Sequence, residues 1–271
     1  MTRIAIAGCA GRMGRMLLAE VLDGGAAELA GGSERHGDPA IGSDLGVLAG
    51  RAPVGRACSD DPRAVFAAAD VVIDFTTPAA SAAHATIAAE AGAALVIGTT
   101  GLSPAQTAAL EAAARRVAVV WAPNMSVGVT LLLDLVERVA GLLDPSYDIE
   151  IVEMHHRHKV DAPSGTALAL GRAAAAGRGV HLEDVWRKSR DGQTGARPEG
   201  EIGFATLRGG DVVGDHAVIF AADGERIEIA HKASSRRVFA RGAVRAALWA
   251  AAQPPGLYTM ADVLGTARDG R

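Results

Sequence analysis

The sequence predicts an α/β protein: a Rossmann-like, doubly wound parallel sheet comes first, followed by a second α+β domain built on a mixed sheet. Three observations predict this. Apolar β-branched runs alternate with Ala-rich helical patterns up to Trp121, a glycine-rich turn follows the first run, and three later strand patterns have no helix between them. With 271 residues, the chain is long enough for two domains.

The first part contains the apolar runs expected to form parallel strands, at residues 4–7, 28–32, 71–75, 95–98 and 117–121, of which 28–32 is the weakest. The helix expected after the fourth run has its own start signal. Ser103 can cap it, Pro104 suits its first turn, and Gln106 completes a capping box. The change from strand to helix period is therefore well marked there.

The second part begins with an amphipathic pattern. We expect helices at residues 127–143 and 166–176, a polar Gly-rich loop at 189–200, and strands at 147–156, 202–207, 212–220 and 226–232. This grouping is typical of a mixed or antiparallel sheet with helices on one face. A last helix at 238–251 is expected to return to the first domain. The predicted boundaries are therefore 1–125, 126–236 and 237–271.

Composition excludes several classes of protein. Lys and Arg number 27 against 31 Asp and Glu, and the net charge of -4 gives no general attraction to nucleic acid or anionic membranes. Cys9 and Cys58 form no ligand-spaced pair, which argues against a disulfide framework or thiolate zinc site and fits a reducing cytosol. No export signal is visible, and the Ala-rich stretch 78–94 carries His84 and Glu90, so we expect a cytoplasmic protein with no membrane span.

A glycine-rich turn joins the first predicted strand to the first predicted helix. It consists of Gly8, Cys9, Ala10, Gly11, Arg12, Met13 and Gly14. A pyrophosphate could meet backbone N–H groups and the positive end of the helix there. The spacing departs from the usual G-x-G-x-x-G pattern, because Cys9 stands where a glycine is expected. A tight turn that binds no nucleotide therefore remains the alternative.

An acidic residue follows the second strand at the distance that a dinucleotide site requires. Glu34 comes 20 residues after Gly14, and its carboxylate could accept both ribose hydroxyls of an adenosine. Arg35 could pair with a 2′-phosphate, so NADH and NADPH both remain open as cofactors. The alternative is an ordinary Glu-Arg pair on a surface loop. Gly98, Thr99 and Thr100 end another strand at the same sheet edge and are expected to line this cleft.

The richest chemical stretch spans residues 153–167. His155, His156 and Lys159 supply titratable donors and a cation, and Ser164-Gly165-Thr166 opens a helix whose N–H groups suit a carboxylate. The stretch therefore predicts a site for a small dicarboxylate undergoing reduction, where an added hydride leaves charge for an acid to quench. A solvated basic loop is the alternative. A zinc site using the histidines would need an irregular backbone, and we expect no metal.

Taken together, these segments resemble the 4-hydroxy-tetrahydrodipicolinate reductase (dihydrodipicolinate reductase) family over essentially the whole chain. The motifs are 8–14, 98–101, 122–128, 155–166, 202–206 and 231–236. The 155–166 string is highly specific, whereas the glycine turn is shared by many nucleotide-binding proteins. Met125 stands where many relatives carry Phe, a change between two apolar residues.

The resemblance implies reduction of 4-hydroxy-tetrahydrodipicolinate by NADH or NADPH in lysine and diaminopimelate biosynthesis, by a homotetramer assembled through the second domain's sheets. His155 would do acid/base work, Lys159 would donate a proton, and His156, Gly165 and Thr166 would contact substrate with Ser164 nearby. The dinucleotide would be held by the 8–14 loop, Glu34, Arg35, Gly98, Thr99, Thr100, Ala122, Pro123, Asn124 and Met125. Domain 1–125 would thus bind dinucleotide, and domain 126–236 substrate and neighbouring subunits.

Two rival functions are weighed against this one. Aspartate-semialdehyde dehydrogenases share the two-domain plan but need a nucleophilic thiol in the catalytic half, and no cysteine follows Cys58. A non-catalytic nucleotide-sensing protein would keep the glycine turn. It would have no need of Lys159, two imidazoles and a Ser-Gly-Thr turn side by side.

Overall fold

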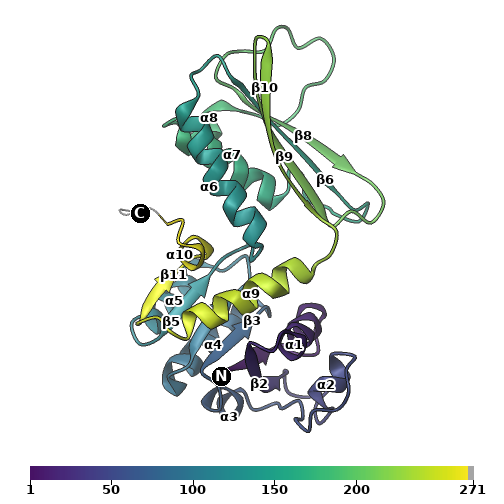
Figure 1. Cartoon of the computed structure of the whole chain (residues 1–271), viewed down its shortest axis with the longest axis vertical. Coiled ribbons are helices and arrows are strands. Elements are labelled where there is room, and N and C mark those ends of the chain that lie inside the picture. The colour runs from purple at the N-terminus through teal and green to yellow at the C-terminus, as the bar shows by residue number, and fades with distance from the viewer. Residues whose placement is uncertain (268–271) are drawn as a thin grey trace. The chain divides into compact units, whose positions relative to one another are not determined.

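The computed structural model describes residues 1–267. These residues form two compact units (Figure 1). Unit 1 comprises Met1–Val127 together with Arg237 and the residues after it, and unit 2 comprises Gly128–Arg236. Each unit has a hydrophobic core of its own.

Unit 1 is built on a parallel sheet. Within residues 1–267 it has six strands: β1 (Thr2–Ala7), β2 (Ala27–Ser33), β3 (Val71–Asp74), β4 (Ala94–Ile97), β5 (Ala118–Trp121) and β11 (Gly256–Tyr258). Their spatial order is β11-β5-β4-β3-β1-β2, and every neighbouring pair is parallel. The order reverses between β1 and β3, the point where open α/β sheets bind ligands. The predicted doubly wound parallel sheet is confirmed, although β11 was not expected.

The central strands of this sheet carry apolar side chains on both faces, and helices cover and bury both faces. One face packs against α1 (Arg12–Gly24) and α9 (Arg237–Ala250). The other packs against α3 (Pro62–Ala67), α4 (Pro78–Ala91) and α5 (Pro104–Ala114). Short helices α2 (Leu45–Leu48) and α10 (Met260–Leu264) complete the unit. The capping box that Ser103 and Gln106 were predicted to form at the start of α5 is confirmed.

Unit 2 is built on a mixed sheet, as predicted. Its strands are β6 (Asp148–His155), β7 (Trp186–Arg187), β8 (Ile202–Arg208), β9 (Gly214–Ala222) and β10 (Glu225–Ala233), in the order β10-β9-β6-β8-β7. The β6 strand is parallel to β8 and antiparallel to β9. Buried and half-buried residues alternate along β6, so one face packs against α6 (Val127–Leu142) and α7 (Gly165–Gly177). A short helix, α8 (Leu182–Val185), precedes β7.

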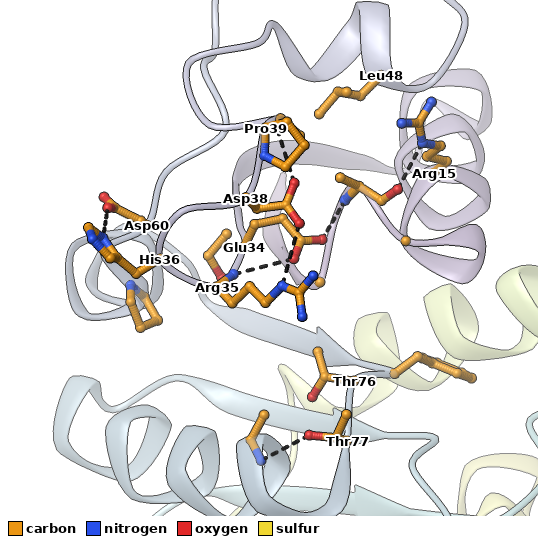
Figure 2. A pocket seen from close by; sticks show the side chains of 18 of the residues that line it. Arg15, Glu34, Arg35, His36, Asp38, Pro39, Leu48, Asp60, Thr76 and Thr77 are labelled. Carbon is orange, nitrogen blue, oxygen red and sulfur yellow. Dashed lines mark hydrogen bonds and ion pairs between the residues drawn. The ribbon is translucent and has the colours of Figure 1, made fainter.

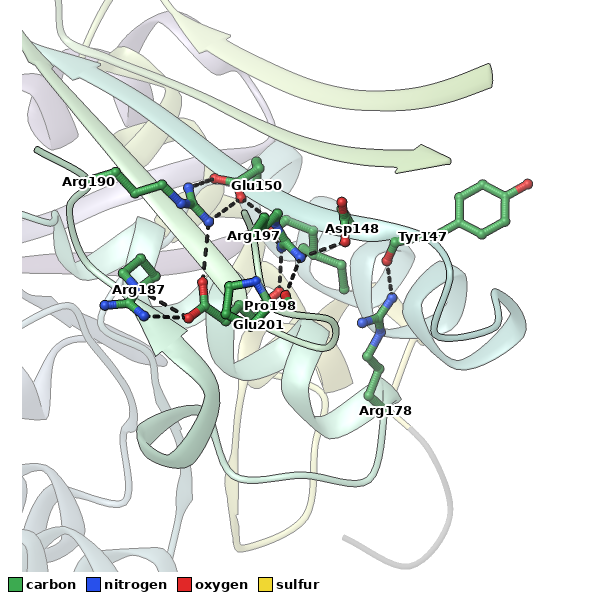
Figure 3. A network of polar contacts seen from close by, with 10 residues as sticks. Tyr147, Asp148, Glu150, Arg178, Arg187, Arg190, Arg197, Pro198 and Glu201 are labelled. Atoms are coloured by element: carbon green, nitrogen blue, oxygen red, sulfur yellow. Dashed lines mark hydrogen bonds and ion pairs between the residues drawn. The ribbon is translucent and has the colours of Figure 1, made fainter. Parts of the chain in front are cut away.

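The polar loop at residues 189–200 is tied to the β6 strand by ion pairs (Figure 3). The Arg197 guanidinium donates to Glu150 at 3.0 Å and to Asp148 at 2.5 Å, and Arg190 donates to both Glu150 oxygens. Arg197 also donates to the carbonyl groups of Ile149 and Glu201. The Arg197 side chain is only 18% exposed, and these bonds hold the loop against the start of β6, the central strand of the sheet.

No helix among residues 1–267 is both long and apolar enough to cross a lipid bilayer.

Candidate active site

The glycine turn lies between β1 and α1, at the carboxyl edge of the sheet. Gly8 has a φ of 67°, and the N–H groups of Gly8 and Cys9 both donate to the Ser33 carbonyl. Gly14 is buried, and a Cβ there would lie 2.7 Å from the Cys9 backbone. Gly11 caps α1 without a side-chain hydrogen bond. No side chain therefore caps the start of α1, where backbone N–H groups can meet a phosphate.

A pocket of about 810 Å³ lies beside this turn, outside the carboxyl ends of β1, β2 and β3. Of the residues predicted to hold a dinucleotide, its lining includes Gly8, Ala10, Gly11, Glu34 and Arg35. In Figure 2, Glu34, Arg35 and Asp38 lie together on one side of the pocket, while Thr76 and Thr77 lie on another. The location is the one that the doubly wound topology favours for a ligand.

The Glu34 carboxylate is held by the backbone. It accepts hydrogen bonds from the Ala10 N–H at 2.9 Å and from the Arg35 N–H at 3.3 Å. The Arg35 side chain is 86% exposed, and its nearest carboxylate, on Asp38, is 3.7 Å away. The carboxylate is thus fixed at the glycine turn, whereas the guanidinium keeps its freedom to reach a ligand.

The remaining predicted dinucleotide residues lie at the same sheet edge in varied surroundings. Arg12 is exposed and Met13 half-buried on the first turn of α1. Thr99 is buried after β4, where its hydroxyl accepts from Ser81 at 2.8 Å, whereas Thr100 is exposed. A Cβ at Gly98 would collide with the Phe75 ring. After β5, Ala122 and Met125 are buried, Pro123 is exposed, and the Asn124 side chain accepts from the Ser126 N–H.

Cys9 points into the core and meets the second cysteine. Its Sγ lies 3.4 Å from the Cys58 Sγ, and both are free, buried thiols. Burial raises the pKa of both thiols. Pattern gave no sign of this contact, because 49 residues separate the two positions.

The pocket also contains polar residues that the sequence analysis did not single out. Fully buried Asp74 accepts hydrogen bonds from the Thr76 N–H and hydroxyl and bonds to the His84 ring at 2.8 Å. Thr76 and His84 both line the pocket. The sequence did offer a signal for this part of the pocket, because Asp74 is a carboxylate at the end of an otherwise apolar strand.

In unit 2, the stretch predicted to carry chemistry joins the end of β6 to the start of α7. His155 is the last residue of β6, and its Nδ1 lies 2.5 Å from a Glu153 oxygen. The other Glu153 oxygen accepts the Ser164 N–H at 3.1 Å. In the structure, the predicted acid/base histidine and the predicted carboxylate-binding turn are therefore both hydrogen-bonded to one buried side chain, that of Glu153.

The other predicted residues of unit 2 lie in the connecting loop and at the helix start. Lys159 Nζ donates to Asp161 at 2.8 Å, and the lysine side chain is 20% exposed. His156 is half-buried, and its Nδ1 has no hydrogen-bond partner among residues 1–267. Burial, followed by the charge of Arg236, lowers the pKa of His156. Gly165 is exposed and Thr166 half-buried in the first turn of α7.

Ser164 is the N-cap of α7. Its hydroxyl accepts the Ala167 N–H at 3.1 Å and lies 3.1 Å from His216 Nε2. Burial, followed by the charge of His155, lowers the pKa of His216 to about 4. The His155 and His216 rings meet edge to face with centroids 5.1 Å apart. His216 is therefore a neutral ring at neutral pH, packed against His155, the predicted acid/base residue.

Sequence reasoning missed Glu153, Arg208 and His216 as members of this site. Glu153 was detectable, since residues two apart on a strand share a face and His155 was already a candidate. Arg208 and His216 arrive through the pairing of β6 with β8 and β9. Within residues 1–267, no group of three or more His, Cys, Asp or Glu side chains is placed to hold a metal ion.

Comparisons with known proteins agree with this geometry. The family model for the dihydrodipicolinate reductase N-terminus matches residues 2–125, and that for its C-terminus matches residues 128–264. A 4-hydroxy-tetrahydrodipicolinate reductase of Dinoroseobacter shibae is 59% identical over 262 residues, covering 97% of each chain. One from Methylocella silvestris is 57% identical over 263 residues, also covering 97% of each.

A solved structure extends the likeness to the fold. It is a dipicolinate-bound dihydrodipicolinate reductase from Paenisporosarcina sp. TG-14, with a TM-score of 0.77 and 26% identity, covering 96% of this chain and 97% of that one. An amine dehydrogenase from Mycobacterium smegmatis shares the fold at a TM-score of 0.60 and 16% identity, covering 96% and 95%. The resemblance that the motifs indicated is thus confirmed, and the chain belongs to the dihydrodipicolinate reductase family of pyridine-nucleotide-dependent oxidoreductases.

Proposed function

We propose that this protein reduces 4-hydroxy-tetrahydrodipicolinate to tetrahydrodipicolinate with a hydride from NADH or NADPH, a step in diaminopimelate and lysine biosynthesis. The observation that carries the proposal is the joining of His155 and the Ser164 turn through Glu153 in unit 2. Membership of the reductase family supports it, as does the dipicolinate named in the related structure, a planar dicarboxylate heterocycle.

The substrate's carboxylates would be held at the start of α7. The first N–H groups of any helix lack partners inside the helix and carry its positive dipole end. Gly165 and Thr166 occupy that turn, and a Cβ at Gly165 would meet nothing within 4 Å, so space is open in front of it. The Nδ1 of His156, which has no hydrogen-bond partner within residues 1–267, is a further donor or acceptor for the ligand.

Proton transfer would fall to Lys159 and His155. Lys159 is a cation held by the exposed Asp161 carboxylate, a bond that a more strongly bound dianion can replace. We assign it the proton donated to the ring carbon next to the one that is reduced. We assign His155 acid/base work through Nε2, because its Nδ1 is engaged with Glu153.

The residues of unit 1 fit a dinucleotide. A Cβ at Gly11 would lie 3.2 Å from the Gly8 carbonyl oxygen, so glycine lets the turn close tightly and leaves its backbone uncovered for a pyrophosphate. The glycine turn would hold the pyrophosphate and Glu34 the adenosine ribose, with residues 98–100 and 122–125 along the same sheet edge. When bound, the nicotinamide supplies the hydride.

We propose that the protein accepts both NADH and NADPH. Glu34 keeps its carboxylate at the glycine turn, where ribose hydroxyls would arrive, and this favours NADH. Arg35 is exposed and only weakly paired with Asp38, so it can turn toward a 2′-phosphate. Arg35→Ala should weaken NADPH binding by about tenfold or more and leave NADH binding nearly unchanged, as measured by parallel fluorescence titrations.

We further propose a cytoplasmic homotetramer assembled through the face of the unit 2 sheet opposite α6 and α7. Val152, Ala217 and Ile219 lie half-buried on this face, and Leu207 is 50% exposed. Light scattering of a Leu207→Lys variant tests the assembly, because a charge buried within such an interface should dissociate it.

The deciding experiment follows NADH and NADPH absorbance with the freshly made condensation product of pyruvate and aspartate semialdehyde. Oxidation of either nucleotide that depends on this substrate supports the proposal. Binding of dinucleotide without turnover would instead indicate a nucleotide-sensing protein.

A further inference from the structure

Glu153 is a buried carboxylate of unit 2 that accepts several hydrogen bonds at once. It lies on β6, two residues before His155, and is 1% exposed. It accepts hydrogen bonds from His155 Nδ1 at 2.5 Å, from Arg208 Nη1 and Nη2 at 2.9 and 3.0 Å, and from the Ser164 N–H at 3.1 Å. A carboxylate is rarely buried unless such partners neutralise and satisfy it.

Each of these donors belongs to a different part of the proposed substrate site. His155 is the acid/base residue, and Ser164 begins the turn that would bind a carboxylate. Arg208 also donates to the Asp161 carbonyl at 2.6 Å, in the loop where Asp161 holds Lys159. The Glu153 carboxylate is therefore linked by hydrogen bonds to the imidazole and the α7 start directly, and to the Lys159 loop through Arg208.

We propose that Glu153 is the positioning residue of this site: it fixes the His155 ring with Nδ1 as the donor, and it sets the Ser164 turn and the Lys159 loop around that ring. The inference rests on the proposed function and deepens it. An ionised carboxylate can only accept hydrogen bonds, so Nδ1 must carry a proton and Nε2 is the nitrogen left for the substrate. The same carboxylate stabilises the imidazolium that forms when Nε2 takes up a proton.

The charges around His155 agree with an ionised Glu153. Burial alone would raise the pKa of Glu153, but hydrogen bonds from Arg208 and His155 outweigh it, and the pKa is lowered. The other charged or titratable groups that act on the pair within residues 1–267 include His216 on β9, with His231 of β10 beside it, and His156, Lys159 and Asp161 in the loop. His216 is kept neutral by burial, so it leaves Glu153 as the anion that balances His155.

The test compares two glutamates of one strand. Glu153→Gln keeps the shape of the side chain but replaces one acceptor oxygen with a donor. Glu150→Gln is the matched control, since Glu150 lies on the opposite face of β6 and pairs with Arg190 and Arg197. The readouts are the His155 tautomer, by NMR of the ¹⁵N-histidine-labelled resting protein assigned with a His155→Asn variant, and the pH dependence of kcat/KM.

In Glu153→Gln we expect His155 to lose the Nδ1–H tautomer, and the pH profile of kcat/KM to shift to lower pH by about one unit or more, because the site loses its buried anion. We expect kcat to fall by about tenfold or more, and Glu153→Asp to recover part of it. Glu150→Gln should keep the wild-type tautomer and profile.

If Glu153→Gln fails to fold because Arg208 loses its partner, the double variant Glu153→Gln, Arg208→Met removes the uncompensated charge, and the same two readouts apply. An unchanged His155 tautomer together with an unshifted pH profile, in whichever variant folds, overturns the proposal. The tautomer is read without substrate, so a wild-type protein that fails to turn over the proposed substrate refutes the function and leaves this inference to its own test.

Discussion

Replacing Gly14 by Ala tests whether the contact between α1 and the glycine turn determines dinucleotide binding. The added Cβ would lie 2.7 Å from the Cα and carbonyl carbon of Cys9, about 0.7 Å inside ordinary contact, and closer still to the Gly8 carbonyl oxygen. All of these are backbone atoms, so no rotamer change can relieve the overlap. The turn must move away from the helix, and the N–H groups that would hold a pyrophosphate must move with it.

The expected magnitude comes from two opposing effects. Overpacking of a close-packed interior costs about 1–3 kcal/mol, whereas Gly to Ala within a helix gains about 0.5–1 kcal/mol. We therefore expect the free energy of unfolding to fall by about 1–2 kcal/mol in urea titrations. The Kd for NADH should rise by about tenfold or more, because pyrophosphate binding depends on the same backbone.

Gly24→Ala is the matched control within the same helix. Gly24 is the last residue of α1, and a Cβ there would meet nothing within 4 Å. That variant should bind NADH as the wild type does and should be as stable or slightly more stable. Wild-type affinity and stability in Gly14→Ala would refute the reasoning, since the clash would then have been absorbed without moving the turn.

Three further predictions follow from unit 2 and from α5. Lys159→Ala should lower kcat by about 10²–10⁴-fold if the ammonium donates the proton, whereas Lys188→Ala, whose ammonium stacks on Trp186, should change kcat little in the same assay. His216 has its pKa lowered from 6.5 to about 4, so the unfolded chain takes up a proton before the folded chain does. Its stabilising contribution, complete above pH 6.5, should fall by up to about 3 kcal/mol as the pH drops from 6.5 to 4. Urea titrations across that range should show a shallower loss for His216→Gln, and an equal slope would contradict this account. Ser103→Ala should cost about 1 kcal/mol in thermal or urea unfolding by removing one half of the capping box, without affecting NADH binding.

The fold could be predicted from the sequence wherever an element is long enough to show its period. The strands and helices around residues 4–121 change between the two periods several times, and the order of these changes specifies a parallel sheet. Elements of a few residues could not be found in this way. β11 has three residues and β7 has two, and each forms only because a neighbouring strand offers an open edge.

The α3 helix is a different case, because a local signal was present. Asp61 caps this helix, with its side chain accepting from the Arg63 and Ala64 N–H groups, and Pro62 stands in the first turn. Asp-Pro before an apolar pattern indicates a helix start. Six residues were too few for the periodicity to attract notice, whereas the capping residues alone would have been sufficient.

In the candidate site, too, residues close in sequence could be predicted, whereas residues brought together by the fold could not. The glycine turn, Glu34 and the 155–166 stretch are contiguous in sequence or sit at fixed offsets, so pattern could find them. Arg208 reaches Glu153 because β8 pairs with β6 in a register that sets Glu153 beside Thr206 and His155 beside Arg208. Strand register over 50 residues is a property of the folded sheet and cannot be derived from local spacing.

Ser164 shows how the structure refines a role that pattern could only outline. The sequence placed Ser164 with Gly165 and Thr166 as one carboxylate-binding turn. In the structure the Ser164 hydroxyl is engaged with the Ala167 N–H and with His216, and the residue is 2% exposed. A hydroxyl committed inside the protein is poorly placed to bind a ligand as well.

The helix starts of α1 and α7, the two with proposed ligands, therefore differ in a way that suits those ligands. At α1 the N-cap is Gly11 and forms no side-chain cap, which lets a bulky pyrophosphate approach the backbone itself. At α7 the Ser164 cap and Glu153 fix the backbone first, so that the N–H groups of Gly165 and Thr166 meet a small carboxylate in a rigid turn. We expect direct substrate contact from Gly165 and Thr166, and an orienting role for Ser164. On this reasoning Ser164→Ala should raise KM through a loosened turn, whereas Gly165→Pro, which removes the Gly165 N–H itself, should weaken substrate binding more strongly.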